Sequence, residues 1–412
     1  MTNRMLLLSA AVLLIGGCGQ KSGDAPDSQP LDLAARAQQI AESSIIVDTH
    51  VDVPYRLNKS PADISSATED GDFDYPRAVA GGLNAPFMSI YTPAEFESEG
   101  RSKEVADSLI TLVEKIVENS PDKFAIARSV ADVEQQFESG LISLPMGMEN
   151  GSPVEGQLTN LRYFFDRGIR YISLTHSLSN HISDSSYDEN RQWNGLSEFG
   201  VRVVREMNRL GIMVDVSHVS DDAFWQILDV SETPVIASHS SARHFTPGFE
   251  RNMSDEMILA LARNGGIIQI NFGSTFLTQE SRDYDDLRSA ARKEYLLEHS
   301  ELKEADIYRS YAKLYAEKHG PYPHATLEDV LDHFDHAIAL VGVDHVGIGS
   351  DFDGVGDSLP NGLKDVSQYP NLISGLLERG YNESDIRKLL GENLLRVWRA
   401  VENHAGATSS ST

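Results

Sequence analysis

The chain has 412 residues, of which 41% are hydrophobic, so it can bury a sizeable core as one large domain or two ordinary ones and is not an intrinsically disordered protein. Its 62 acidic residues outnumber the 35 lysines and arginines and give a formal net charge of -27. Because no basic cluster offsets this charge, the sequence argues against nucleic acid or an anionic membrane surface as a partner.

The N-terminus has the layout of a secretory signal. Arg4 precedes an apolar run over residues 5–15, and small residues then lead to Cys18. The run is too short to cross a bilayer. Its end, IGGC at residues 15–18, resembles the lipobox of bacterial lipoproteins, in which the cysteine is acylated after cleavage and becomes the first residue.

Cys18 is the only cysteine of the chain, which excludes a disulfide framework and favours the lipid-bearing role. A plain signal peptide that happens to contain a cysteine is the alternative. We predict a signal peptide over residues 1–17 and a flexible tether over residues 18–30. Gly19 is not the aspartate that tends to retain lipoproteins at the inner membrane. We therefore expect a protein that is anchored to a membrane through Cys18 and faces the periplasm, with the outer membrane favoured.

Short β-prone apolar runs alternate with segments of helical periodicity in the rest of the chain. The runs lie at residues 45–47, 87–91, 141–148, 169–174, 212–216, 235–237, 267–272 and 346–348. Helical segments lie between them, for example at residues 102–120, 199–210, 254–265 and 327–342. Strand followed by helix, eight times, predicts an α/β fold of the (β/α)8 TIM-barrel type, and a doubly wound open sheet is the main alternative.

The domain boundaries follow from this pattern. We predict one barrel domain over residues 31–404, interrupted by an insertion at about residues 279–325 that is rich in charge and tyrosine. Residues 405–412 are predicted to be a disordered tail. Glycines stand where a helix should end and the next strand should follow, at Gly211, Gly265 and Gly342.

Most of the predicted strands end in a histidine or an acid. In a barrel all strand carboxyl ends open onto one face, so these residues should converge, whereas an open sheet would spread them along an edge. Neutral imidazoles and carboxylates are the usual ligands of Zn2+ and similar ions, so their convergence predicts a metal site. The residues are His50, Asp52, Glu149, His176, Asp215, His218, His239, Asp351 and Asp353.

A single histidine after a strand is more often a hydrogen-bonded structural residue than a ligand, so position has to separate the candidates. His50 and Asp52 share one side of a strand, as a two-ligand clasp requires. His218 and His239 follow neighbouring apolar runs in matching fashion. Glu149 precedes a glycine that lets the backbone approach a ligand closely, although a helix-capping role is the alternative.

Another histidine pair lies on a predicted helix. His333 and His336 are three residues apart, which is a possible ligand spacing. Apolar neighbours such as Phe334 and Ile338 instead indicate a packing face. We predict a structural role for both histidines.

Eight motifs in order carry a family resemblance. The chain resembles the membrane dipeptidase family, also called renal dipeptidase or peptidase family M19, from about residue 40 to the C-terminus. The motifs are DTHVD, GMENG, LTHS, VDVSH, IASHSS, ERNMSD, GIGSDFDG and GENLLRVW. The resemblance implies a (β/α)8 barrel of the amidohydrolase type with two Zn2+ ions per chain.

The resemblance also implies which residues bind the ions. His50 and Asp52 would bind one zinc, His218 and His239 the other, and Glu149 would bridge both. A water or hydroxide shared by the two ions would attack the peptide bond, because two adjacent zinc ions lower the pKa of water from about 16 to about 7.

Three further residues receive roles from the resemblance. His176 would contact the substrate and help to stabilise the oxyanion, and Asp351 would carry a proton as a catalytic and substrate-binding acid. Arg251 would bind the terminal carboxylate of the substrate, with a surface salt bridge as the alternative. The implied substrates are dipeptides, including those with a D-residue at the C-terminal position, and the implied assembly is a homodimer.

The sequence departs from the family at the bridging acid. The family commonly has Gly-Glu-Gly-Gly there, whereas Met148 and Asn150 flank Glu149 in this chain. Another binuclear amidohydrolase-type hydrolase, acting on lactams or lactones, is the alternative enzyme, although such enzymes usually show His-x-His on the first strand. A periplasmic solute- or metal-binding lipoprotein is the alternative outside enzymes.

Overall fold

The computed structural model describes residues 1, 32–302 and 304–409 of the chain. The predicted signal peptide, the tether and Cys18 therefore lie outside the described residues, apart from Met1. Among the residues that are described, no helix combines the length and the apolar character that a membrane span requires.

The core of the structure is a closed barrel of parallel strands, which confirms the predicted (β/α)8 fold. Around the barrel the strands follow the order β1-β10-β9-β8-β7-β6-β5-β2. Their bounds are β1 Ile46–Val51, β2 Leu83–Tyr91, β5 Met146–Glu149, β6 Ile169–Ser173, β7 Met213–Asp215, β8 Ile236–Ser240, β9 Ile267–Ile270 and β10 Val346–Ile348.

The apolar run at residues 141–148 forms two strands where the sequence predicts one. Pro145 divides it, because proline has no backbone N–H to give to a ladder. The first part is β4 (Ile142–Leu144), which pairs with β3 (Phe124–Ile126) outside the barrel. Only the second part, β5, enters the barrel, and it ends at Glu149.

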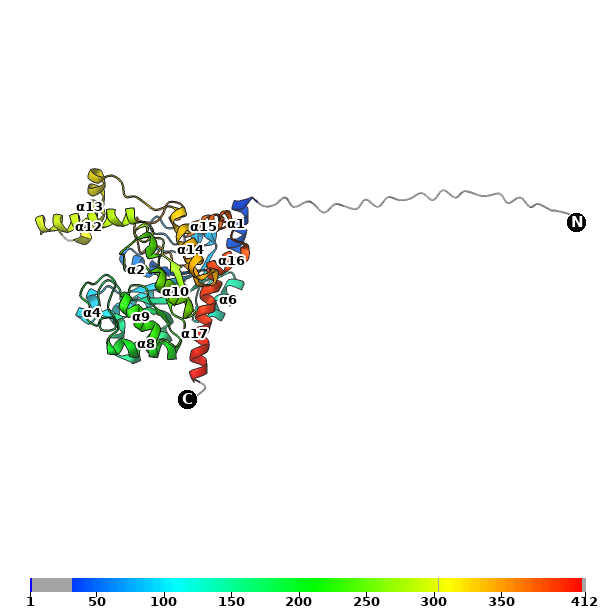
Figure 1. Cartoon of the computed structure of the whole chain (residues 1–412), viewed down its shortest axis with the longest axis horizontal. Coiled ribbons are helices and arrows are strands. Elements are labelled where there is room, and N and C mark those ends of the chain that lie inside the picture. Colours follow the sequence, from blue (N-terminus) through cyan, green and yellow to red (C-terminus); the bar gives the residue numbers. More distant parts are fainter. Residues whose placement is uncertain (2–31, 303, 410–412) are drawn as a thin grey trace.

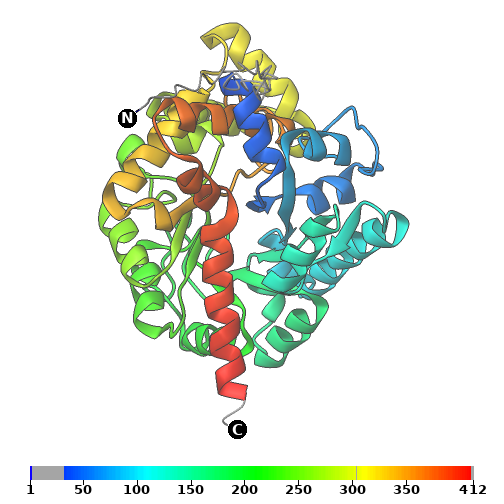
Figure 2. The same cartoon turned by 90° about the vertical axis from the view of Figure 1, so that its right-hand side faces the viewer.

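Helices surround the barrel, as Figure 2 shows. The longer ones are α1 Leu33–Glu42, α2 Val53–Lys59, α3 Tyr75–Gly81, α5 Ser102–Asn119, α6 Val130–Glu138, α7 Leu158–Arg167, α8 Glu198–Leu210, α9 Asp221–Val230, α10 Asp255–Arg263, α12 Gln279–Glu298, α13 Glu304–His319, α14 Leu327–Val341, α15 Tyr369–Glu378 and α17 Asn393–Ser409. The short ones are α4 Glu95–Glu99, α11 Ser274–Leu277 and α16 Glu383–Arg387. Short 3-10 turns include η1 Ser152–Val154 and η2 Arg243–Phe245, and a π-turn spans Lys388–Glu392.

Helix α17 closes one end of the barrel. Its Trp398 is fully buried and packs against Phe87 of β2 with ring centroids 5.4 Å apart. The same apolar cluster includes Val47 of β1 and Tyr171 of β6. The helix continues to Ser409, so residues 405–409 are helical where the sequence predicts a disordered tail.

The insertion forms helices α12 and α13, which project from one side of the barrel in Figure 1. It follows β9 and so belongs to the end of the barrel opposite α17. Leu287 and Leu297 of α12 are exposed, which shows that this helix adds little to the core.

Candidate metal centre and active site

The ends of four barrel strands bring the five predicted metal ligands into one buried cluster. His50 lies on β1 and Asp52 directly follows it, Glu149 ends β5, His218 follows β7, and His239 lies on β8. All five side chains are buried. Residues that are far apart in the sequence therefore meet at the open end of the barrel, as the parallel strand order requires.

Glu149 lies at the centre of this cluster and its two oxygens face different partners. Oε1 lies 3.0 Å from His218 Nε2 and 3.3 Å from His239 Nε2. Oε2 lies 3.4 Å from His50 Nε2, which in turn lies 3.4 Å from Asp52 Oδ2. Glu149 thus faces the His218–His239 pair with one oxygen and the His50–Asp52 pair with the other.

The spacing of these atoms fits bound cations. Around a tetrahedral ion with bonds of about 2.0 Å, ligand atoms stand about 3.3 Å apart. The Nε2 atoms of His218 and His239 are 2.9 Å apart, which is close to this value. His50 Nε2 and Asp52 Oδ1 are buried without a hydrogen-bond partner, an arrangement that costs about 1–3 kcal/mol per atom unless a ligand satisfies it.

Neighbouring hydroxyl groups set the tautomers of two histidines. Tyr171 donates its hydroxyl hydrogen to the carbonyl of Thr49 (2.9 Å), so at 2.9 Å from His50 Nδ1 it must accept the hydrogen of that nitrogen. Ser238 donates to Asp215 Oδ2 (2.6 Å) and accepts from His239 Nδ1 (2.7 Å) in the same way. In the neutral form of both rings Nε2 therefore carries the lone pair and points into the cluster, as a metal ligand must.

The electrostatics of the cluster keep His218 and His239 neutral and the bridging acid charged. For His50 burial alone would lower the pKa, but Tyr171, Glu149 and Asp52 outweigh it and raise the pKa well above the ordinary value. Burial, with Arg251 and neighbouring histidines, holds the pKa of His218 and of His239 well below the ordinary value. Burial opposes ionisation of Glu149, but the surrounding histidines outweigh it and hold the pKa of Glu149 well below its usual range. Neutral imidazole and ionised carboxylate are the forms that bind metal ions.

Two residues of the rim adopt backbone conformations that side chains rarely take. His218 has φ 73° and Asp351 has φ 65°, both in the left-handed region. Such strain persists only where the surroundings hold it, and it gathers at functional sites.

Asp351 lies beside the cluster and is held by Asn271. Asn271 Nδ2 donates to Asp351 Oδ2 at 2.8 Å, and Asp351 lies close enough to His50 and Asp52 to offer an oxygen to the same ion. Burial, with the charges of Asp52 and Glu149, raises the pKa of Asp351 to about 7. Asn271 was not among the predicted site residues, although a polar side chain directly after the apolar run of β9 is a visible signal.

His176 lies on the opposite side of Glu149. Its Nε2 is 3.5 Å from Glu149 Oε1, and its Nδ1 is buried without a hydrogen-bond partner. Its ring packs between Tyr91 and His218, with centroids at 4.6 and 4.2 Å. His176 therefore lies next to the ligand cluster, and its partly exposed side chain can contact a bound molecule.

Arg251 is buried and has no carboxylate partner among the described residues. Its guanidinium donates to Ser240 Oγ and to the carbonyl of His239, both at 2.8 Å, and its Nε has no partner. The alternative of a surface salt bridge does not fit this burial. A buried guanidinium without an acid indicates that an anionic ligand binds there.

Two acids that the sequence analysis placed in the convergent set do not join it. Asp215 lies below the cluster and is fully hydrogen-bonded, by Ser173, Ser217 and Ser238. Asp353 turns away from the cluster and accepts from Arg56 Nε at 2.8 Å. Alternation along a strand predicts a side of the sheet, and it does not reveal a partner brought in by another loop.

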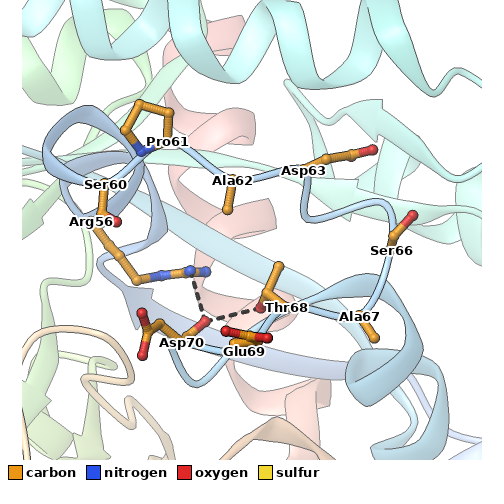
Figure 3. A pocket seen from close by; sticks show the side chains of 10 residues that line it. All are labelled: Arg56, Ser60, Pro61, Ala62, Asp63, Ser66, Ala67, Thr68, Glu69 and Asp70. Carbon is orange, nitrogen blue, oxygen red and sulfur yellow. Dashed lines mark hydrogen bonds between the residues drawn. The ribbon is translucent and has the colours of Figure 1, made fainter.

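Arg56 also borders a cavity of about 370 Å³, shown in Figure 3. The loop over residues 60–70 lines the rest of it, and Arg56 donates to the carbonyl of Asp70 at 3.2 Å. None of the lining residues is a predicted metal ligand. The arginine therefore connects this loop to Asp353, and through it to the segment that carries Asp351.

The fold and the site together define a metal-dependent hydrolase of the barrel type. The model of the membrane dipeptidase family, peptidase family M19, matches residues 34–412. The chain belongs to this family, as its motifs predict, and it is a metallo-dipeptidase.

Solved structures agree with this assignment. The chain is similar to a probable dipeptidase, PvdM, from Pseudomonas aeruginosa, with 28% identity, a TM-score of 0.80, and coverage of 92% of this chain and 100% of that one. It is also similar to the M19 metallopeptidase described as dipeptidase AC, with 26% identity, a TM-score of 0.71, and coverage of 87% and 99%.

A third structure contains a bound ligand. It is a metallopeptidase from Rhodobacter sphaeroides in complex with a phosphinate mimic of the dipeptide L-Ala-D-Ala. The identity is 26%, the TM-score is 0.71, and the alignment covers 87% of this chain and 100% of that one.

Proposed function

We propose that the protein is a dipeptidase that uses two Zn2+ ions per chain. His50 and Asp52 would hold one ion, His218 and His239 the other, and Glu149 would bridge both. The observation that carries the proposal is the division of Glu149, whose two oxygens face separate sets of imidazoles and acids. When bound, the ions supply Lewis acidity that polarises a peptide carbonyl and lowers the pKa of water.

His176 is the candidate for stabilising the oxyanion. It lies beside Glu149 with one nitrogen, Nδ1, that has no hydrogen-bond partner in the buried site. A hydrogen bond from a preorganised imidazole to the developing oxyanion stabilises the transition state more than the ground state.

Asp351 is the candidate for moving the proton. Asn271 fixes one carboxylate oxygen, which leaves the other free to accept a proton from water and to pass it to the departing amine. Its place beside His50 and Asp52 supports this role, because a peptide bond cleaved at the metal ions would lie close to this carboxylate.

Arg251 is the candidate for selecting dipeptides. Its buried guanidinium lies against the backbone of His239 and has no acid partner of its own among the described residues. A substrate carboxylate bound there would be one residue beyond the cleaved bond. A longer peptide has no carboxylate at that position and would leave the arginine unpaired.

We further propose that a D-residue is accepted at the C-terminal position. The support is the Rhodobacter sphaeroides relative, which binds a mimic of L-Ala-D-Ala. Met148 of β5 and Asn150, which follows the strand, differ from the common family pattern, so the range of accepted residues has to be measured on this chain.

The test compares free and amidated dipeptides. With zinc-loaded protein, we expect hydrolysis of L-Ala-L-Ala and L-Ala-D-Ala and poor hydrolysis of their C-terminal amides. Arg251→Ala should raise KM for the free dipeptides by about 10–100-fold, which corresponds to charged hydrogen bonds of about 1.5–3 kcal/mol, and should leave the amides unchanged. Arg205→Ala, an exposed arginine on α8, is the control. An equal rise in KM for the free dipeptides and for their amides would show that Arg251 does not bind the terminal carboxylate.

The cellular place of the protein is a separate proposal. The IGGC motif supports acylation of Cys18 and attachment to a membrane facing the periplasm, with the outer membrane favoured. Homodimerisation is proposed from the family resemblance. Replacement of Cys18 by alanine should abolish incorporation of labelled palmitate, and continued incorporation would refute the anchor.

A further inference from the structure

A second group of metal-competent side chains lies outside the active site. It consists of His244 in η2, Asp255 at the start of α10 and His336 on α14, and one ligand atom from each lies within 4.8 Å of the others. His336 Nε2 is 2.8 Å from Asp255 Oδ1. The rings of His244 and His336 stack with centroids 4.4 Å apart and an interplanar angle of 21°.

The structure separates His336 from its neighbour His333, although the sequence predicts a structural role for both. His333 is fully buried, its Nδ1 accepts the backbone hydrogen of Ala242 at 3.1 Å, and its Nε2 lies 3.0 Å from the carbonyl of Leu277. Both nitrogens are therefore used. His336 lies about one turn later on the helix, its side chain is 18% exposed, and its bonded partner is a carboxylate.

The backbone around the three residues is held by other contacts. Arg243 donates to both oxygens of Asp221, at 2.7 and 2.6 Å, and to the carbonyl of Asn252 at 2.7 Å. Ser254 caps helix α10 by accepting the backbone hydrogen of Met257. Helices α10 and α14 pack against each other and lie side by side in Figure 1. The ligand atoms thus come from fixed elements, which limits the cost of bringing them onto one ion.

We propose that His244, Asp255 and His336 form a third metal site, which binds a divalent transition ion such as Zn2+. Two imidazoles and one carboxylate are a nitrogen and oxygen set that suits Zn2+, Co2+ or Ni2+, whereas Mg2+ and Ca2+ prefer oxygen alone. His244 is exposed, so its ring has room to turn and bring a nitrogen to the spacing of about 3.3 Å that a tetrahedral ion requires. Water completes the coordination on the exposed side.

The position of this site gives it a consequence for the active site. His244 and Asp255 lie at the two ends of the segment that carries Arg251, and His336 lies on a separate helix. An ion bound by all three ties both ends of this segment to α14. Occupancy therefore restricts opening of the segment and keeps the guanidinium of Arg251 in place.

The experiment measures zinc bound by the full chain after metal removal and reconstitution with zinc chloride. Wild type should retain one zinc per chain more than His244→Ala and one more than Asp255→Asn after desalting, whatever number the active site holds. Loss of one ligand should weaken this site by at least ~10-fold in titration calorimetry. His319→Ala is the matched control, because His319 is an exposed helical histidine, as His244 is exposed, and belongs to none of the metal-competent groups of the described residues. Its ring packs on Tyr315 with centroids 4.2 Å apart.

Hydrogen exchange provides a second readout. Zinc should slow exchange of the backbone amides of residues 244–255 in wild type and in His319→Ala, and should not do so in His244→Ala. Equal zinc content and equal isotherms for wild type, His244→Ala and Asp255→Asn would overturn the site. An equal loss of zinc in His319→Ala would also overturn it. Zinc binding without slower exchange would overturn the tie to the Arg251 segment.

Discussion

Two layers of buried polar side chains lie one above the other at the open end of the barrel, and they differ in how they are satisfied. In the lower layer Asp48 accepts from Ser350, Tyr369 and the backbone of His50. Asp215 is likewise surrounded by serine donors. In the upper layer Asp52 keeps one oxygen without any partner.

The unpaired atoms of the upper layer indicate a role in ligand binding. The chain is able to surround a buried carboxylate with donors, because it does so twice directly beneath the cluster. It does not do so for Asp52 or for Nε2 of His50. Since unpaired buried polar atoms are costly, their presence among the candidate ligands supports a role of the upper layer in metal binding. The lower layer holds the upper layer in position.

The largest effect should follow from removal of Glu149, which lies between the His50–Asp52 pair and the His218–His239 pair. We expect Glu149→Gln to lose metal from both sets of ligands and to lower kcat/KM by about 10³-fold or more, since metal ions supply several kcal/mol and each 1.36 kcal/mol is tenfold in rate. Metal content and dipeptide hydrolysis measure both effects. Glu155→Gln changes a nearby carboxylate that only caps α5 through Lys103, and should behave as wild type. Retention of both ions by Glu149→Gln would show that Glu149 is not required for metal binding.

A smaller effect is expected at Asp351, which belongs to the upper layer and has one satisfied oxygen. Asp351→Asn should keep the metal content, because the five predicted ligands are intact, and should lower kcat by ~10²-fold or more through loss of proton transfer. An amide at this position still accepts a hydrogen bond from Asn271. Full turnover in the variant would remove Asp351 from the reaction.

A change in the lower layer should act through the histidine above it. Asp215→Asn removes the anionic acceptor of Ser238 and so weakens the hydrogen bond that orients His239. We expect zinc affinity to fall by about 10–100-fold, as for other supporting partners of metal ligands, and saturating zinc should restore turnover. Loss of turnover that zinc does not restore would show that Asp215 acts in the reaction itself.

The smallest effect concerns His333, a buried imidazole that resembles the lower layer because both nitrogens are bonded. Burial lowers the pKa of His333 to about 4. The unfolded imidazole takes up a proton below about pH 6.5 and the folded one does not, so the free energy of unfolding falls as pH drops from about 6.5 to about 4.

Between about pH 6.5 and pH 4 the neutral His333 should change the free energy of unfolding by at most about 3 kcal/mol. In urea unfolding, the free energy of His333→Gln should therefore depend less steeply on pH than that of the wild type. His319→Gln serves as the control. Parallel curves for His333→Gln and wild type would show that another group carries the dependence.

The barrel and the convergence of its ligands were predictable from sequence because both depend on local pattern. Apolar runs that alternate with helical segments define parallel strands, and parallel strands bring their ends together. His50 shows this most simply, since a histidine at the end of the first run had to reach the same rim as Glu149. The family model then agrees with the motifs over residues 34–412.

The supporting contacts were not predictable because they join residues that no local pattern connects. Tyr369 donates to Asp48 across 321 positions, and Asn271 donates to Asp351 across 80. Pro145 divides a run that hydrophobicity alone presents as one strand. Asp215 and Asp353 are aspartates like the predicted ligand Asp52, so the sequence cannot distinguish them. Only the structure shows that they bind serines and Arg56 and have a supporting role.

Helix α17, which closes the far end of the barrel, is connected to the candidate ligand His50 through two aromatic contacts. Trp398 packs on Phe87, Phe87 packs on Tyr171 at 5.4 Å, and the hydroxyl of Tyr171 accepts the hydrogen of His50 Nδ1. A helix late in the sequence thus supports a candidate metal ligand on the first strand of the barrel. A chain truncated before Trp398 would lose the packing beneath Tyr171, and with it the contact that orients His50.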